Sequence, residues 1–143
     1  MPNKLILFIS LLLISGFGFR QEKPRILIIG DSISIGYTPF VKKALSDKAI
    51  VQHNAGNAKF SSYGLEQLDH WLGNEKWDII QFNWGLWDLC YRDPSKEALV
   101  GNRDKKHGAI TATKSQYKAN LEAIVKRLKQ TGAKLIFVTT TVV

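Results

Sequence analysis

Short apolar runs alternate along this chain with segments whose apolar residues recur at helical spacing. The runs are rich in β-branched residues and end in turn formers, which is typical of strands buried in a parallel sheet. Such an alternation predicts right-handed βαβ units, and so a three-layer α/β/α fold with a parallel sheet. The predicted strands are 25–29, 49–53, 77–82 and 134–141, and the predicted helices lie at 40–45, from Ser61 or Ser62 to Leu72, and between Thr113 and Gly132.

Local signals mark the ends of several elements. Ser61 or Ser62 is expected to cap the second helix, and Gly73 to stop it. Thr113 and Gln116 have the spacing of a capping box at the start of the third helix. The long stretch 83–112 shows neither the helical spacing of apolar residues nor an apolar run typical of a strand, so we expect irregular structure there.

The first residues are typical of a secretory signal peptide. Lys4 precedes the apolar run 5–14, and small residues follow that run. A membrane span needs about 20 apolar residues, so this run is short for a membrane helix. The alternative to a cleaved signal peptide is an uncleaved N-terminal anchor. No cysteine directly follows the apolar run, and a lipoprotein is therefore not expected. We predict a signal peptide at 1–18, with a boundary as late as about residue 22, and a secreted or periplasmic domain at 23–143.

Composition narrows the classes of function. The chain has 143 residues, enough for one domain, and Cys90 is its only cysteine, which excludes an internal disulfide. Its formal net charge is +8, with many of the cations between 92 and 129. Tyr117 is the single aromatic residue among them, too few for a platform on which bases stack, so nucleic acid is not an expected partner. His53, His70 and Cys90 have no metal-ligand spacing.

Polar residues follow each of the first three predicted strands. Parallel strands bring their carboxyl ends to one edge of the sheet, where open α/β folds bind ligands. A serine there can act as a nucleophile, and glycine amides and asparagine side chains can stabilise an oxyanion. This combination favours acyl transfer. The residues are Asp31 and Ser32 after the first strand, Asn54, Gly56 and Asn57 after the second, and Asn83, Gly85 and Asp88 after the third.

The stretch 25–37 resembles the first motif of the SGNH/GDSL hydrolases, which are esterases and lipases with a flavodoxin-like three-layer fold. Gly30-Asp31-Ser32 is identical to that motif, and Ile33 replaces its leucine. The resemblance implies that Ser32 is the nucleophile and that its own backbone N–H is one oxyanion donor. It also implies that no metal or cofactor takes part.

Two further stretches are similar to the second and third motifs of this family. Asn54-Ala55-Gly56 resembles the second, which makes the amide of Gly56 a donor. Residues 85–88 match the third, with Trp87 where the family has asparagine, and Asn83 lies just upstream. The resemblance thus implies Ser32 and Gly56 as oxyanion donors, supported by Asp31, Asn54 and Asp88. An indole N–H can also donate, so Trp87 or the upstream Asn83 is expected to supply the third donor.

The last motif of the family, aspartate-any-any-histidine near the C-terminus, supplies its general base. The sequence ends at 139–143 without it, so we expect a chain incomplete at its C-terminus and inactive or weak as an enzyme. Asp104 and His107 have the same spacing but lie in the loop after the third strand, and they are an alternative base.

The function predicted from these residues is hydrolysis of a carboxylic or carbohydrate-acetyl ester through an acyl-serine intermediate. The expected partner is a small-molecule or glycan ester. A non-catalytic glycan- or acyl-binding protein is the alternative. Trp84 and Trp87 beside the site would then be stacking surfaces, unless they anchor their loop to the core, whereas Trp77 is expected in the core. A nucleotide-binding domain is disfavoured because Gly30 and Gly36 lack the G-x-G-x-x-G spacing.

Overall fold

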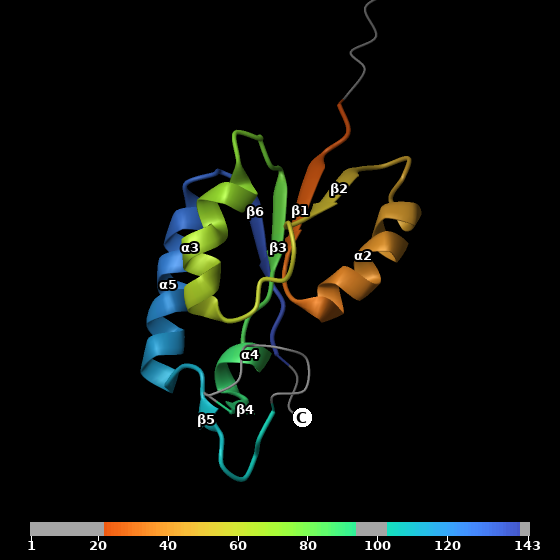
Figure 1. Ribbon diagram of the computed structural model, residues 1–143. Helices are drawn as coiled ribbons and strands as arrows, with labels where there is room; N and C mark the ends of the chain where they lie inside the picture. The colour runs from red at the N-terminus through yellow and green to blue at the C-terminus, as the bar shows by residue number, and fades with distance from the viewer. Residues whose placement is uncertain (1–21, 94–102, 141–143) are drawn as a thin grey trace, which may run out of the picture.

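Four parallel strands form the centre of the molecule, in the order β2-β1-β3-β6 (Figure 1). The computed structural model describes residues 22–93 and 103–140. Each of the three pairings is parallel, so the carboxyl ends of the strands lie at one edge, as the sequence predicts. The strands are β1 (Arg25–Ile29), β2 (Ile50–His53), β3 (Ile79–Phe82) and β6 (Lys134–Phe137).

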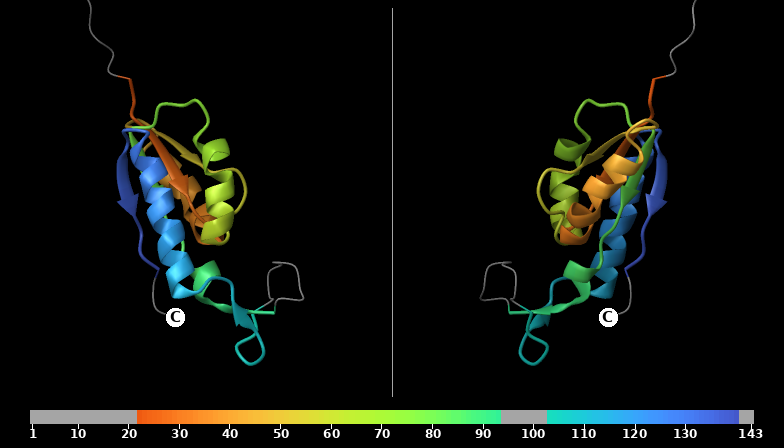
Figure 2. Two further views of the ribbon diagram at one scale, coloured as in Figure 1. Left: turned by 90° about the vertical axis from the view of Figure 1, so that its left-hand side faces the viewer. Right: turned by 90° about the vertical axis from the view of Figure 1, so that its right-hand side faces the viewer.

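Helices cover both faces of this sheet, and the predicted α/β/α layering is confirmed (Figures 1 and 2). Successive side chains of a strand point to opposite faces. Leu27 and Ile29 of β1 therefore join the core beneath α3 and α5, while Ile28 joins a smaller cluster with Val41 of α2. The helices are α2 (Ser32–Ala44), α3 (Ser61–Leu72) and α5 (Lys114–Lys129).

Short elements lie between β3 and α5, where the sequence predicts only irregular structure. They are α4 (Leu86–Leu89), β4 (Tyr91–Arg92) and β5 (Ala109–Ile110). β4 and β5 pair in antiparallel fashion beyond the carboxyl edge of the main sheet (Figure 1). The prediction for this stretch was wrong in those places, because elements of two to four residues leave no periodic pattern.

The first helix begins earlier than the sequence predicts. We expected it at 40–45, after Gly36, but α2 begins at Ser32 and runs through both Gly36 and Pro39. Asp31 caps it, since its carboxylate accepts a hydrogen bond of 3.0 Å from the backbone N–H of Ile33. The turn after β1 is therefore already the first turn of the helix.

The ends of the other two helices differ in how they are capped. The capping box at α5 is confirmed: Gln116 N–H donates to Thr113 Oγ1 at 3.2 Å, and Thr113 N–H donates to Gln116 Oε1 at 2.9 Å. The predicted serine cap of α3 is wrong, because Phe60 is its N-cap residue and makes no side-chain cap. The carboxylate of Asp88 in α4 binds the N–H of Ser61 instead.

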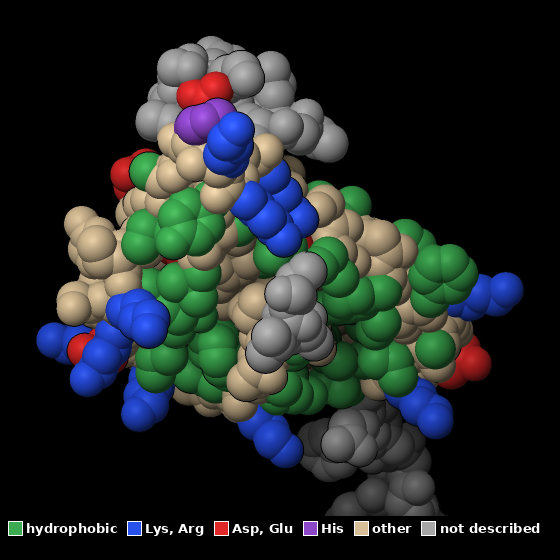
Figure 3. All heavy atoms as spheres, turned by 90° about the horizontal axis from the view of Figure 1, so that it is seen from below, with side chains coloured by type: hydrophobic (Ala, Val, Ile, Leu, Met, Phe, Trp, Pro, Cys, Tyr) green, Lys and Arg blue, Asp and Glu red, His purple; other side chains and the backbone are tan. Residues whose placement is uncertain are grey.

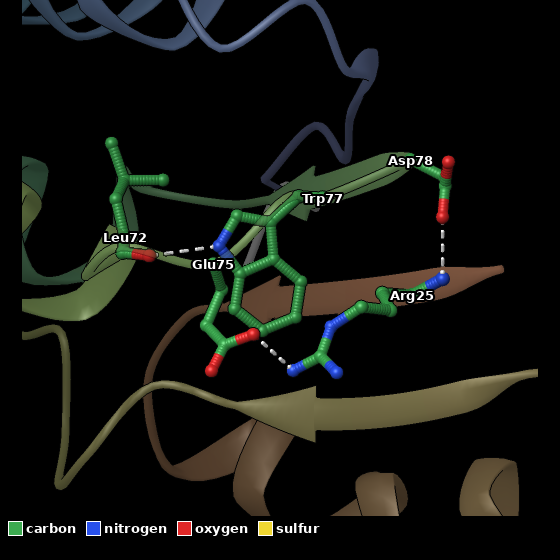
Figure 4. A network of polar contacts seen from close by, with 5 residues as sticks. All are labelled: Arg25, Leu72, Glu75, Trp77 and Asp78. Carbon is green, nitrogen blue, oxygen red and sulfur yellow. Dashed lines mark hydrogen bonds and ion pairs between the residues drawn. The ribbon is translucent and has the colours of Figure 1, made fainter.

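At the amino edge of the sheet, a polar network ties β1 to the chain before β3 (Figure 4). The guanidinium of Arg25 is 2.7 Å from a carboxylate oxygen of Glu75 and lies 5.4 Å from the ring centroid of Trp77. Arg25 N–H donates to Asp78 at 2.7 Å, and the buried indole of Trp77 donates to Leu72 O at 2.9 Å. Trp77 is thus a core residue, as predicted, although β3 starts only at Ile79.

Two predictions concern the ends of the chain, which the described residues include only in part. The predicted signal peptide, 1–18, lies outside the described residues. In the ranges that are described, no helix combines the length and the apolar composition that crossing a bilayer requires. The last strand, predicted at 134–141, ends at Phe137. Phe137 pairs with Phe82, and this is the last residue pair between β6 and β3.

Candidate active site

Ser32 lies at the carboxyl edge of the sheet, between the end of β1 and the first turn of α2. Its side chain is exposed, whereas Asp31 before it is only 6% exposed. The carboxylate of Asp31 caps the helix, and its carbonyl accepts a bond of 3.0 Å from Ile35 N–H. Asp31 therefore fixes the turn that presents the Ser32 hydroxyl to solvent.

Gly30 holds this turn against the loop that follows β2. Gly30 N–H donates to Asn54 Oδ1 at 2.9 Å, and Gly30 O accepts from Ala58 N–H at 3.0 Å. A Cβ at this position would lie 2.6 Å from Ser34 Oγ, so a larger residue does not fit without movement. Asn54 is buried, and its other side-chain group donates to Gly56 O at 3.1 Å. Asn54 thus connects the predicted nucleophile turn with the predicted oxyanion loop.

Gly56 is exposed at the tip of that loop. Its φ of +69° is in the left-handed region, which glycine adopts without a steric cost. The loop is held from below by Asn54 and continues into Asn57, whose side chain accepts from Lys59 N–H at 2.8 Å. The role of the Gly56 amide as an oxyanion donor stays a prediction.

Asn83 follows β3 at the same edge. Its backbone N–H donates to Ile29 O at 3.1 Å, and its side-chain amide donates to Val138 O at 2.5 Å. A pocket of about 210 Å³ opens here, and Figure 3 views the molecule from this side. The pocket is lined by Asp31, Ile33, Ser34, Tyr37, Asn83, Leu86, Val138, Thr139 and Thr140. The structure therefore brings Asn83 and both chain neighbours of Ser32 to one pocket.

The two tryptophans expected beside the site differ in their surroundings. Trp84 is 1% exposed; its indole donates to Ala58 O at 3.2 Å and its ring packs on Gly64. Of the two roles expected for Trp84, anchoring its loop to the core is confirmed and lining a substrate groove is wrong. Trp87 in α4 is half-buried, and the guanidinium of Arg92 lies 3.9 Å from its ring centroid. Its role as an indole donor to an oxyanion stays a prediction.

Asp88 has no exposed surface. Its carboxylate accepts bonds from the N–H and the hydroxyl of Ser61, and Asn120 of α5 donates to that hydroxyl at 2.9 Å. Burial raises the pKa of Asp88 and outweighs the hydrogen bonds from Ser61, which lower it. Asp88 therefore joins α4, α3 and α5, and its support of the catalytic site stays a prediction.

Asp104 and His107 lie in an exposed turn between β4 and β5, drawn in cyan at the bottom of Figure 1. The backbone N–H groups of Lys106 and His107 each donate to Asp104 Oδ1 at 2.9 Å and lower the pKa of that carboxyl. His107 Nδ1 is 3.6 Å from Asp104 Oδ2. The two side chains thus interact within their own turn, and their use as a base stays a prediction.

One contact near the site was missed by the sequence analysis. Ser34 Oγ in α2 is 2.7 Å from His53 Nε2 at the end of β2. Nothing in the spacing of the two residues indicates it, because they meet through the pairing of β1 with β2. His70 is exposed on α3. Across the described ranges, no three His, Cys, Asp or Glu side chains are grouped so that they could hold a metal ion.

Compared by sequence, the chain matches no protein-family model and no curated protein. Compared by structure, it is similar to TesA, with a TM-score of 0.59 and 21% identity over 82% of this chain and 61% of TesA. It is also similar to the acetyl xylan esterase AlAXEase, with a TM-score of 0.61 and 13% identity over 79% of this chain and 56% of the esterase. The chain has the fold of the SGNH/GDSL hydrolases.

A GDSL-like lipase from Bacteroides thetaiotaomicron shares this SGNH/GDSL fold over 94% of the chain, with a TM-score of 0.55 and 15% identity. The resemblance that the motifs predict is thereby confirmed for the fold. The chain spans 56–61% of TesA, the esterase and the lipase, which is less than two thirds of each. Because one fold hosts many activities, the chemistry must be argued from the site itself.

Proposed function

We propose that this chain carries the nucleophile and oxyanion donors of a serine ester hydrolase, with Ser32 as the nucleophile. The observation that supports this most is the exposure of Ser32 on a capped strand-to-helix turn, beside a pocket at the carboxyl edge of the sheet. The loops with Gly56 and Asn83 follow the two strands that flank β1, so both start next to this turn.

In the proposed reaction, Ser32 Oγ attacks the acyl carbon of an ester and gives its proton to a base. The charge that forms on the carbonyl oxygen is met by the N–H of Ser32 itself. Ser32 is the first residue of α2, and the first N–H groups of a helix have no partner within the helix. Gly56 N–H and a side-chain donor from Asn83 or Trp87 complete the oxyanion hole. The alcohol leaves, and water then hydrolyses the acyl-Ser32 intermediate.

The base is the component for which this chain offers least support. The sequence has three histidines. His53 contacts Ser34 and the carbonyl of Asn54, His70 is exposed on α3, and His107 pairs with Asp104. We therefore propose that the efficient base and its orienting acid come from polypeptide outside this chain, and we expect the chain alone to hydrolyse esters slowly.

The proposed substrates are carboxylic esters, including acetylated glycans. The names of the structural neighbours, which include an acylhydrolase and an acetyl xylan esterase, support this class. Ser32 is exposed, so an ester can reach its hydroxyl. Export by the predicted signal peptide would bring the protein to extracellular or periplasmic substrates of this kind.

Hydrolysis of p-nitrophenyl acetate and labelling by a fluorophosphonate test the nucleophile. We expect slow release of p-nitrophenol above the buffer rate and a covalent adduct on Ser32 in the digested protein. Ser32→Ala should remove both. Ser62→Ala is the matched control, since Ser62 is an exposed serine in the first turn of α3 and should change neither. Undiminished hydrolysis by Ser32→Ala would overturn the assignment.

A non-catalytic binder of glycans or acyl groups is the second candidate, and the absence of a histidine contact to Ser32 among the described residues favours it. The same labelling experiment distinguishes the two candidates. A binder would retain acetylated xylan on a column while Ser32 stays unlabelled. In an enzyme, the fluorophosphonate would label Ser32 faster than Ser62, because only an activated hydroxyl attacks the phosphonate quickly.

A further inference from the structure

A buried serine and a histidine connect the two loops of the candidate site. Ser34 is 4% exposed and lies two residues after Ser32 in the first turn of α2. Its Oγ is 2.7 Å from the carbonyl of Asp31 and also 2.7 Å from Nε2 of His53. The other ring nitrogen of His53, Nδ1, is 2.8 Å from the carbonyl of Asn54. The mechanism proposed above uses neither Ser34 nor His53.

Counting protons shows that these three contacts depend on the charge of His53. A carbonyl oxygen only accepts, so the contact with Asn54 requires a proton on Nδ1. In neutral His53 that leaves Nε2 as an acceptor, and the single proton of the Ser34 hydroxyl then faces two acceptors, Nε2 and Asp31 O. With both nitrogens protonated, Nε2 donates to Ser34, Ser34 donates to Asp31, and all three contacts are hydrogen bonds.

The contacts join the turn that carries Ser32 to the loop that carries Gly56. Two other bonds do the same, from Gly30 N–H to Asn54 and from Ala58 N–H to Gly30 O, but they involve no titratable group. The link through His53 is the one of these three that a proton can change. Because Ser34 and Ser32 share one helical turn, a looser Ser34 also leaves Ser32 less fixed.

We propose that His53 is a positioning residue, which in its doubly protonated form holds the first turn of α2 against the loop after β2 and so sets the distance between the Ser32 hydroxyl and the Gly56 amide. This inference rests on the proposed function for its effect on the reaction. Loss of the Nε2 proton removes one of the three hydrogen bonds and loosens the turn. Catalytic geometry must hold within about 0.5 Å, so such loosening lowers kcat more than it changes KM.

One charged side chain lines the groove beside His53, and another lies in the turn that Ser34 contacts. Lys42 of α2 lines the same open groove as His53. Asp31 carries the carboxylate of the β1–α2 turn, and its carbonyl accepts from the Ser34 hydroxyl. From β1, the residue in register with His53 is the apolar Ile28, and the loop 54–57 carries no charge.

Amide hydrogen exchange tests the positioning without any need for activity. Ile35 N–H bonds to Asp31 O, and Gly64 N–H bonds to Phe60 O, both at 3.0 Å and both four residues after a helix N-cap. Their ratio of exchange rates cancels the general effect of pH. Between about pH 5 and 8, where histidines titrate, we expect the Ile35/Gly64 ratio to rise about three- to tenfold, the effect of one hydrogen bond.

The variants isolate the proton from the side chain. His53→Gln keeps an amide donor toward Ser34 but cannot titrate, so its exchange ratio should stay constant and low over the same pH range. Ser34→Ala removes the link, and its ratio should be high and constant. His70→Gln, an exposed histidine on α3, should behave as the wild type. A ratio that rises equally in wild type and His53→Gln would overturn the proposal.

The activity measurement separates this inference from the proposed function. The ratio of wild-type to His53→Gln kcat cancels the pH dependence of the base, and it should fall about three- to tenfold as His53 loses its proton, with the KM ratio unchanged. Exchange that follows His53 in a protein without hydrolysis would refute the hydrolase and leave the positioning intact. A kcat ratio that is flat in an active protein would refute the positioning of Ser32 and leave the hydrolase intact.

Discussion

Replacing Asp88 by alanine tests the most buried polar network of the molecule. The carboxylate of Asp88 lies at the N-terminus of α3 and accepts from Ser61 N–H at 2.9 and 3.1 Å, and from the Ser61 hydroxyl. Neither Asp88 nor Ser61 has exposed surface. The alanine variant thus leaves two donors of Ser61 inside the protein without this acceptor, in the place of a helix cap.

The expected loss follows from those two donors. A buried group left without its partner costs about 1–3 kcal/mol, so two of them cost about 2–6 kcal/mol. The free energy of unfolding of such a domain is about 5–15 kcal/mol, so the loss should be readily visible. Urea unfolding at pH 7, followed by tryptophan fluorescence, gives the value. Asp88→Asn keeps one acceptor for Ser61 and should lose less than half as much, and a loss below about 0.5 kcal/mol for Asp88→Ala would refute the argument.

Stability should also depend on pH through Asp88. Burial raises the pKa of this carboxyl above its ordinary value of 3.8. Between 3.8 and the raised value, the folded protein binds more protons than the unfolded chain, so the free energy of unfolding falls as pH rises through this window. The difference between wild type and Asp88→Asn should therefore grow in favour of the wild type on acidification toward pH 4. A difference that shrinks would mean that the hydrogen bonds from Ser61 outweigh burial.

Two further substitutions test packing and capping, again by urea unfolding. Gly64→Ala should destabilise by up to about 2 kcal/mol. The new methyl group meets the buried ring of Trp84, which costs about 1–3 kcal/mol, and about 1 kcal/mol of gained helix propensity offsets part of that cost. Gly36→Ala in α2, where nothing lies near the added Cβ, is the control and should stabilise. Thr113→Ala should cost about 0.5–2 kcal/mol by removing the capping box with Gln116, and an unchanged midpoint would show that the cap contributes nothing.

The fold could be predicted because its signals are local. The apolar strand β1, the capping box at Thr113 and the glycine stop after α3 each depend on residues a few positions apart. The start of α2 could not be predicted in this way. Gly36 and Pro39 are unfavourable in a helix, and the Asp31 cap and the packing of α2 on β2 outweigh them.

For the site, the sequence predicts which residues lie at the edge of the sheet, but not which side chains they contact. Ser32 and the loops with Gly56 and Asn83 do share one edge, since parallel strands bring them there. The surroundings of Trp84 depend on Gly64, which is twenty positions away and leaves space for its ring. The contact of Ser34 with His53 likewise depends on how α2 packs on β2. Periodicity carries no information on such pairs.

The match between residues 85–88 and the third family motif illustrates why a motif position and a chemical role must be argued separately. At the fourth position, Asp88 is directed away from solvent and holds α3, so its contribution is to stability. At the third, the ring of Trp87 lies under the guanidinium of Arg92. The side-chain amide of Asn83 donates a hydrogen bond to Val138 O. We therefore expect the backbone amides of Ser32 and Gly56 to carry most of the proposed oxyanion stabilisation, with Asn83 or Trp87 adding one donor. The spacing between the two loops, and with it the proposed link through His53, would then be the decisive geometry of the site.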